Sequence, residues 1–253
     1  MRFARSHSTY TRWLNARLLL AISTKIFRIG NEKMHEPQRR YRNFDHLILG
    51  TPSLESTVAL LHKRLGSEPY FGGSHPKHGT SNYLLPMGGR TYLEIIGASS
   101  PKARLDKVGR QLECLEGPRL IGIALETNDM ARTLASAQSR QITLDISEPG
   151  ERRTASGALL QWEAVNFNQT QFGEMLFFAI DWKGSSHPSE SSISSAELTS
   201  FEIRSEASNL LQTYCALLDC DLVINETTGG TTLSAQIQGP HGSLSLSSEQ
   251  DPT

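Results

Sequence analysis

The sequence lacks the features of a membrane-spanning protein and of a disulfide-bonded one. Its longest apolar stretch, residues 18–24, ends at Lys25 and falls far short of the roughly 20 residues that cross a bilayer. The only three cysteines are Cys114, Cys215 and Cys220, an odd number without a C-x-x-C pair and a poor disulfide framework. We therefore expect reduced thiols, a cytoplasmic location and no membrane span.

Common catalytic motifs are also missing. There is no G-x-S-x-G elbow, no G-x-x-x-x-G-K phosphate loop, no G-x-G-x-x-G turn and no H-E-x-x-H helix. Hydrolase, nucleotide-dependent and zinc-protease functions lose their usual support.

The charges are unevenly distributed along the chain. Residues 1–43 hold ten of the 25 Lys and Arg residues but only two of the 26 acids, which leaves the other 210 residues with a net charge of −9. An acidic body argues against a nucleic-acid groove, so we expect a small-molecule partner.

The basic segment 1–43 stands apart from the rest as an extension. Its first 31 residues have six Lys or Arg, no acid and a short apolar stretch, which resembles an organelle-targeting peptide. The alternative is that translation starts at Met34. In either case we expect the extension to be disordered or a targeting segment outside the fold.

A strand followed by a helix occurs twice, 76 residues apart. Residues 44–52 predict a buried strand, and 53–66 predict a helix that starts at Ser53 and ends at Gly66. Residues 120–127 and 129–137 repeat this pattern. Three strand-like runs follow each helix, at 68–72, 80–86 and 90–96 in the first unit and at 142–147, 158–165 and 174–180 in the second.

A third, weaker copy follows near the C-terminus. It has a strand at 198–204, a helix through 210–218 and runs at 221–226, 231–238 and 243–247. The chain therefore predicts an α+β fold of repeated βαβββ units. Residues 44–183 form a half-open barrel, 184–195 a Ser-rich linker, and 196–253 a third unit that packs on the barrel, covers its mouth or pairs with another subunit in a homodimer.

Several motifs of the first unit resemble the glyoxalase-like domain family of the vicinal-oxygen-chelate superfamily, which also includes bleomycin-resistance proteins and dioxygenases. The resemblance covers about residues 44–190. It rests on Asp45-His46-Leu47, on Arg64-Leu65-Gly66, on the G-x-H-P-x-x-G-T-x-N run within 72–82, on residues 92–96 and on 177–182.

This resemblance implies a divalent metal held by inward-facing His and Glu side chains of both units. His46 and Glu94 match the positions of the first unit, and Fe, Mn, Zn or Ni would suit them equally. In the second unit Gly122 stands in the place of His46 and Phe178 in that of Glu94, so the second ligand pair is missing. His75, His78 or a residue of the third unit would have to complete the set.

The residues themselves point to the same side chains. Glu94 alternates with Leu93 and Ile95, which places it on the cavity face if they face the helices. His46 is then a ligand or an acid/base group, or else a packed histidine bonded to the backbone.

The segment 72–82 has the composition of a ligand-lining loop, with His75, His78, Thr80 and Asn82 as substrate-binding candidates, unless it is a plain turn. Trp182 is expected to plug the barrel end beside the turn-forming Asp181. The pairs Arg152-Arg153 and Arg39-Arg40 are predicted to be solvated.

Three functions stay open from the sequence. The first is a lyase, isomerase or dioxygenase that acts on a small oxygenated metabolite through His46 and Glu94. The second is a metal-free ligand-binding protein of the bleomycin-resistance type. The third is a structural or dimerising module.

Overall fold

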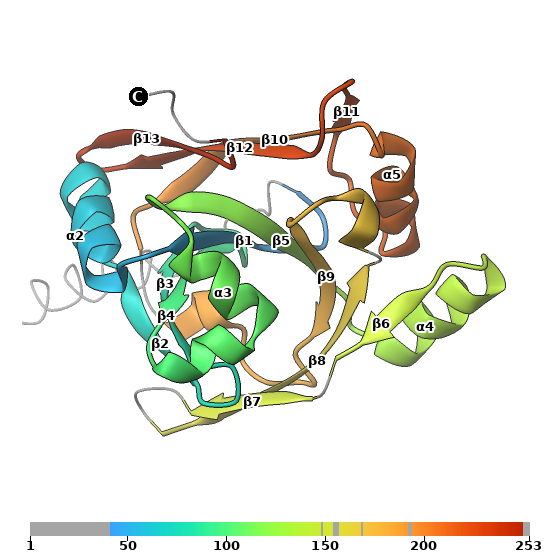
Figure 1. The fold of residues 1–253 in the computed structure, drawn as a ribbon, viewed down its shortest axis with the longest axis horizontal. Coiled ribbons are helices and arrows are strands. Elements are labelled where there is room, and N and C mark those ends of the chain that lie inside the picture. Colours follow the sequence, from blue (N-terminus) through green and yellow to red (C-terminus); the bar gives the residue numbers. More distant parts are fainter. Residues whose placement is uncertain (1–40, 148, 154–156, 168, 192–193, 250–253) are drawn as a thin grey trace, which may run out of the picture. The chain divides into compact units, whose positions relative to one another are not determined.

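The computed structural model describes residues 41–147, 149–153, 157–167, 169–191 and 194–249, which fold into repeated βαβββ units (Figure 1). The first unit consists of β1 (Phe44–Thr51), α2 (Leu54–Leu65), β2 (Tyr70–His75), β3 (Thr80–Pro86) and β4 (Tyr92–Ala98). The second has β5 (Arg119–Glu126), α4 (Met130–Ser139), β6 (Leu144–Ile146), β7 (Gly150–Arg153), β8 (Leu159–Phe167), the 3₁₀ turn η2 (Gln169–Gln171) and β9 (Leu176–Asp181). The third has β10 (Glu197–Ser205), α5 (Ser208–Leu217), β11 (Ile224–Glu226), β12 (Thr232–Gly239) and β13 (Gly242–Ser247).

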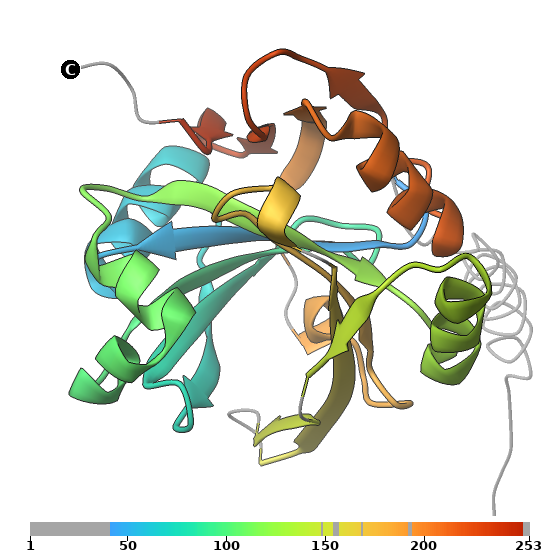
Figure 2. The ribbon, with the colours of Figure 1, turned by 45° about the vertical axis from the view of Figure 1, so that its right-hand side comes forward.

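The strands of the first two units form one curled sheet. Within the described residues its order is β2-β3-β4-β1-β5-β9-β8-β6, with β7 paired to β8. The two opening strands, β1 and β5, meet antiparallel at the centre, and each pairs in parallel with the last strand of its own unit. Figure 2 shows the two halves of the sheet diverging from this centre, so that the sheet curls around a concave face, which we call the trough. This is the half-open barrel that the sequence predicts.

Alternation along the central strands assigns residues to the two faces of the sheet. Leu47 and Leu49 of β1 join the core cluster that contains the buried leucines of α2, whereas Ile48 belongs to a separate cluster on the concave face. The alternation continues in β4, where Leu93 and Ile95 are fully buried on the helix side. The concave face is therefore left to His46, Ile48, Tyr92 and Glu94.

One end of the concave face is covered by two short helices that the sequence pattern does not predict. They are η1 (Pro101–Leu105) and α3 (Lys107–Glu113), in the connection between the units. Asp106 caps α3 by accepting from the backbone amides of Val108 and Gly109. Leu112 then packs with Ile48 and closes this end of the trough.

The third unit shares the order of elements but not the sheet topology of the first two. Its sheet order is β11-β10-β12-β13, so the opening strand pairs in parallel with the first of the three later strands rather than the last. This sheet lies on the convex side of the barrel, opposite the trough (Figure 2). Phe44 stacks on Phe201 with ring centroids 5.3 Å apart, and Phe167 stacks on Tyr214 at 4.1 Å. Packing on the barrel is thus the arrangement found among the three left open.

The turn at Gly66 shows how closely the third unit fits. Gly66 ends α2 in the left-handed conformation with φ 71°, as the sequence predicts. A Cβ atom at this position would lie 2.7 Å from the ring of His241, which sits in the turn between β12 and β13. Glycine is therefore required here both by the turn and by the packing of the third unit.

Within the described residues no helix is long and apolar enough to cross a membrane, and Cys114, Cys215 and Cys220 are free thiols. The expected targeting segment and Arg39-Arg40 lie outside the described residues.

Candidate functional site

A β-bulge in β1 brings two neighbouring polar residues onto the concave face. The register between β1 and β5 shifts between Phe44 and His46, so Asp45 is the extra residue. Because a bulge interrupts the strand's alternation, Asp45 and His46 need not point to opposite faces. Their side chains in fact meet, with His46 Nδ1 2.6 Å from Asp45 Oδ1, and both are buried.

His46 also faces Glu94, its predicted partner. The Nε2 atom of His46 lies 3.5 Å from Glu94 Oε2, and it has no hydrogen-bond partner among the described residues. Burial by itself would lower the pKa of His46, but Asp45 and Glu94 outweigh it and raise that pKa to about 9. Burial would likewise raise the pKa of Glu94, yet the imidazolium lowers it to about 2. The pair is therefore ionised at neutral pH.

Asp45 is held by two further residues at the other end of the barrel. Its Oδ2 atom accepts from Trp182 Nε1 at 2.9 Å and lies 3.1 Å from His187 Nε2. Burial would raise the pKa of Asp45, and the hydrogen bonds to His187 and His46 lower it well below its usual range. Trp182 is buried, as expected of a plug, but it also anchors the carboxylate that orients His46.

His187 is a site residue that the sequence pattern misses. It precedes η3 (Pro188–Ser191) in the Ser-rich segment, which the composition predicts to be only a linker, yet its ring is 1% exposed. The one feature of the sequence that could have pointed to His187 is that a histidine stands in a stretch made mostly of serines.

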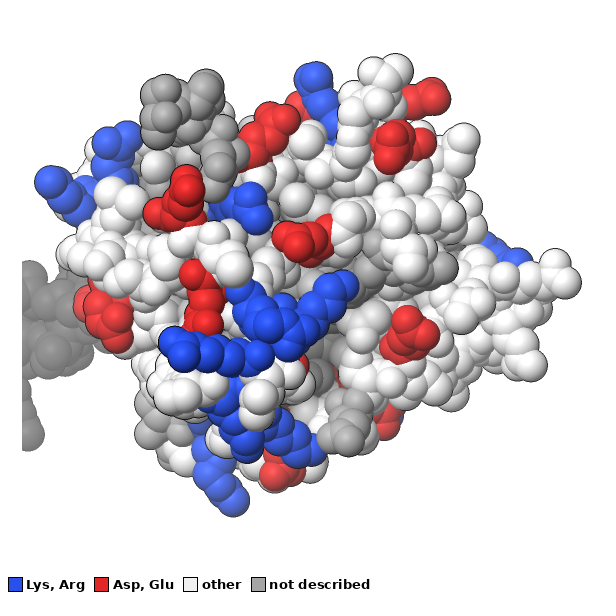
Figure 3. Space-filling view, viewed as in Figure 1, with Lys and Arg blue, Asp and Glu red and all other residues white. Residues whose placement is uncertain are grey.

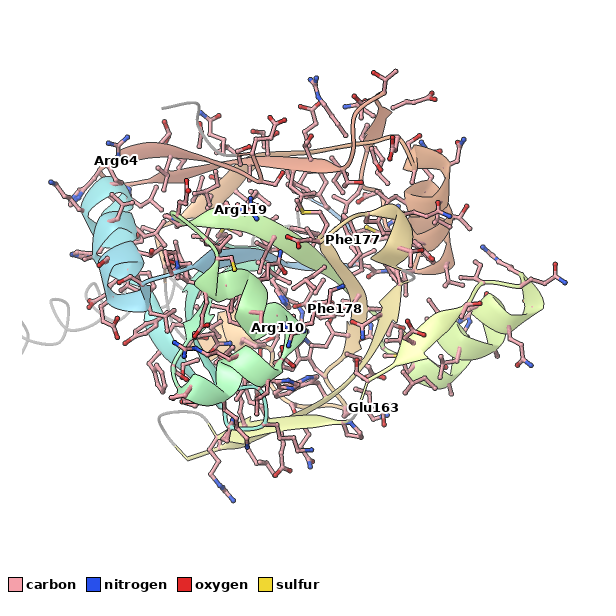
Figure 4. All side chains as sticks on the ribbon, in the orientation of Figure 1. Arg64, Arg110, Arg119, Glu163, Phe177 and Phe178 are labelled. Carbon is pink, nitrogen blue, oxygen red and sulfur yellow. The ribbon has the colours of Figure 1, made fainter. Side chains whose placement is uncertain are left out.

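A cleft of about 1120 Å³ opens beside this network. It lies between the β2–β3 turn of the first unit and strands β7 and β8 of the second. Figure 4 labels Glu163 on β8 and Phe178 on β9, which both line it. The ring of Phe178 also packs edge-on against His46, with centroids 5.8 Å apart. His46 therefore lies one side chain removed from the cleft, and neither His46 nor Glu94 is among the residues that line it.

The predicted substrate-binding residues fall into two groups. His75 and His78 line the cleft; His78 is exposed and its Nδ1 atom lies 2.9 Å from Asp106 Oδ2. Thr80 and Asn82 are buried behind them. Thr80 Oγ1 lies 3.1 Å from His75 Nδ1, and Asn82 donates to Glu94 Oε1 at 2.6 Å. Burial also lowers the pKa of His75.

Arg152 is buried, so the prediction that it is solvated is wrong. It sits on β7, a four-residue strand that the sequence does not reveal, and it donates from Nη1 to the Gly72 carbonyl of β2. The residue is 8% exposed and lines the cleft, whereas Arg153 is exposed as predicted. Alternation along β7 separates the two arginines.

Other basic residues gather outside the cleft. Figure 3 shows Lys and Arg side chains over η1 and α3, the segment that contains Lys102, Arg104, Lys107 and Arg110. None of these four lines the cleft. They form a solvated face of the short helices.

The family model for the glyoxalase-like domain matches residues 44–218. The chain belongs to the glyoxalase-like domain family. The match confirms the resemblance seen in the sequence and runs past the barrel through β10 and α5. The predicted α+β fold is confirmed as well.

Solved structures of similar fold share little sequence with this glyoxalase-like protein. A hypothetical protein from Staphylococcus aureus aligns with a TM-score of 0.57 and 18% identity, covering 82% of this chain and 85% of that one. Methylmalonyl-CoA epimerase from Mycobacterium tuberculosis has a TM-score of 0.43 and 14% identity, with 55% and 87% of the two chains covered. The epimerase from Streptomyces coelicolor has 0.43 and 19%, with 55% and 96% covered. No curated protein matches the chain.

The ligand set that the superfamily uses for a metal is incomplete in this glyoxalase-like protein. In the strand registers Ile48 pairs with Glu94 in the first unit, and Ala124 pairs with Phe178 in the second. Because Ala124 follows Ile48 by 76 residues, the spacing of the repeat, Phe178 occupies the position in the second unit that Glu94 occupies in the first. A Cβ atom on Gly122 would lie 2.2 Å from the Leu176 carbonyl oxygen, so no side chain fits there. No group of three or more His, Cys, Asp or Glu side chains among the described residues is arranged to hold a metal. One imidazole and one carboxylate do not fit a chelated metal ion.

Proposed function

We propose that this protein binds a small oxygenated molecule in the cleft without a resident metal. The observation that carries the proposal is the pair of replacements at Gly122 and Phe178, which removes half of the superfamily's ligand set. One replaced position is closed to any side chain by Leu176, and the other holds a ring against His46. The cleft remains open beside them, which favours binding over a purely structural module.

The charged network lies behind the residues that line this cleft and holds them in place, because Phe178 of the lining packs against His46. Asp45 fixes the ring of His46, and Asn82 fixes Glu94 from the opposite side. Each charge of this Asp45–His46–Glu94 network has an opposite charge or a hydrogen-bond donor within reach, which is the condition for keeping ions inside a protein. Phe178 and Trp162 add apolar surface to the cleft, so its lining combines aromatic rings with a few placed polar groups.

Metal content tests the proposal first. Mass spectrometry on protein purified without chelator or affinity nickel is expected to find Fe, Mn, Zn and Ni each far below one ion per chain. Near-stoichiometric metal that is lost in both His46→Ala and Glu94→Ala would overturn the metal-free proposal. A thermal-shift screen of small oxygenated acids, ketoaldehydes and catechols on the same protein then tests binding.

A second candidate is a metal-independent lyase or isomerase that moves a proton on the bound molecule. It is favoured by the exposure of Glu94, whose side chain is 14% accessible while His46 is 3% accessible. Glu94 is ionised at neutral pH and is the more accessible group of the pair, so it is the carboxylate that can accept a proton; its pKa of about 2 makes it a weak base and predicts slow exchange. Solvent deuterium uptake into the screened compounds, followed by NMR, tests this. Uptake that Glu94→Gln abolishes would support catalysis over binding alone.

A further inference from the structure

Arg152 carries a buried positive charge that forms an ion pair with no acid in the described part of the chain. Its side chain lies across the first unit, where the Cδ atom is 3.1 Å from the position a Cβ would take on Gly73. One hydrogen bond, from Nη1 to the Gly72 carbonyl, joins β7 to β2. Among the described residues no carboxylate forms an ion pair with Arg152. A buried cation without a counterion is costly, which is unusual in a structure whose other buried charges are paired.

We propose that the guanidinium of Arg152 binds the carboxylate of the ligand in the cleft. This inference rests on the proposed function and names the chemical class of the ligand. A guanidinium is a planar fork that donates two parallel hydrogen bonds to a carboxylate, and within the described residues only Nη1 of Arg152 donates to the protein. The remaining N–H groups belong to a residue that lines the cleft.

The charges around Arg152 favour a ligand with a single negative charge. Lys183, also at the cleft, is exposed and pairs with Glu163 at 3.3 Å. Burial lowers the pKa of His75, so its ring is neutral at physiological pH. Lys77 and Arg153 are exposed, where solvent and salt screen their charge. Arg152 is thus the buried cation of the described cleft lining, and one carboxylate matches it.

The aromatic lining defines the rest of the ligand. Trp162 and Phe178 line the same cleft and offer flat apolar surface. A small monocarboxylate with a hydroxyl or keto oxygen and a flat apolar part fits this combination of groups.

Matched pairs of acids and amides test the assignment directly. Benzoate and benzamide, mandelate and mandelamide, and lactate and lactamide are titrated into the ¹⁵N-labelled full chain. The indole N–H signal of Trp162 reports occupancy of the cleft. We expect each acid that binds to do so at least tenfold more tightly than its amide. Arg152→Gln should abolish this preference, while Arg132→Gln, which removes the same charge from the exposed face of α4, should retain it.

The outcomes separate this inference from the proposed function. Equal binding of acids and amides, or a preference that survives in Arg152→Gln, overturns the role of Arg152 and leaves cleft binding intact. If no compound of either kind moves the Trp162 signal in folded protein, both proposals fail. Arg152→Lys is the second variant, in case Gln loosens the contact between β7 and β2. Lysine keeps the positive charge but lacks the planar guanidinium. The preference of Arg152→Lys for acids over amides is therefore expected to lie between those of the wild type and Arg152→Gln.

Discussion

The inserted residue in β1 determines which side chains meet inside the barrel. Without the bulge at Asp45, strand alternation would send Asp45 and His46 to opposite faces. With it, Asp45 is hydrogen-bonded to His46, His187 and Trp182, and His46 faces Glu94. The ionisation of the site therefore depends on backbone geometry as well as on residue identity.

The raised pKa of His46 predicts a loss of stability at alkaline pH. Its pKa is about 9 in the folded protein against an ordinary 6.5, so its contribution is complete below pH 6.5 and is lost as pH rises through 9. Urea denaturation at pH 6, 7.5 and 9 should show the free energy of unfolding falling by a few kcal/mol from this group. His46→Gln should flatten that fall. The exposed His62→Gln should not, and an equal fall in His46→Gln would refute the assignment.

Glu94 gives the corresponding prediction at acid pH. Its pKa is about 2 when folded against an ordinary 4.5, so its contribution is present above pH 4.5 and is lost as pH falls toward 2. Glu94→Gln should cost roughly 2–4 kcal/mol at pH 6, since it breaks one half of a buried ion pair. It should also lower the pKa of His46, measured by NMR of the ring, from about 9 toward 6.5. Glu55→Gln on the exposed side of α2 is the control. An unchanged His46 pKa in Glu94→Gln would show that Asp45 alone sets it.

At the scale of elements, the close contact between β5 and β9 constrains the site. Gly122→Ala would put a Cβ atom 2.2 Å from the Leu176 carbonyl, so one strand must move. We expect a loss of roughly 3 kcal/mol or more in urea denaturation. Gly117→Ala, which meets nothing within 4 Å, should change stability by well under 1 kcal/mol. Similar losses in the two variants would mean that the strands have room to separate.

The sequence predicts the long, periodic elements and the inward side of β4. It cannot reveal short elements that form only because tertiary contacts stabilise them. The helix α3 is short, and it is stabilised by the packing of Leu112 and Val108 in the cluster that contains Ile48. The strand β7 has four residues, too few for alternation to be visible, so the sequence wrongly predicts that Arg152 is solvated. The roles of His46 and Glu94 stay predictions. His187 could not be predicted, because its contact with Asp45 joins residues 142 positions apart in the sequence.

At the scale of the whole molecule, the third unit and the barrel share one core. Tyr214 of α5 is 2% exposed and stacks on Phe167 of β8. Both units therefore should unfold together. A homodimer, which the sequence leaves open, stays a prediction that light scattering can test.

Tyr214→Ala tests this coupling. We expect a loss of roughly 3–5 kcal/mol, because a large buried ring is removed from a shared core. Tryptophan fluorescence in urea, measured with Trp13→Phe as the background, reports the barrel, since Trp162 and Trp182 lie there and residues 196–253 contain no Trp. The transition should shift to lower urea as one step, while Val223→Ala, at a site 68% exposed, should leave it in place. If the barrel unfolds at the same urea concentration in Tyr214→Ala as in the wild type, the barrel and the third unit fold independently.

The close approach at Gly122 makes a chelating ligand set hard to build into this barrel. A histidine could occupy this position only if the strands first moved apart, and a strand shift without the histidine would weaken the protein with nothing gained. Two changes would have to arrive together. New activities in this barrel are therefore easier to obtain by changing residues at the mouth of the trough than by rebuilding a metal centre. A design that aims at a metal site should first move β9 away from Gly122 and only then introduce the ligands.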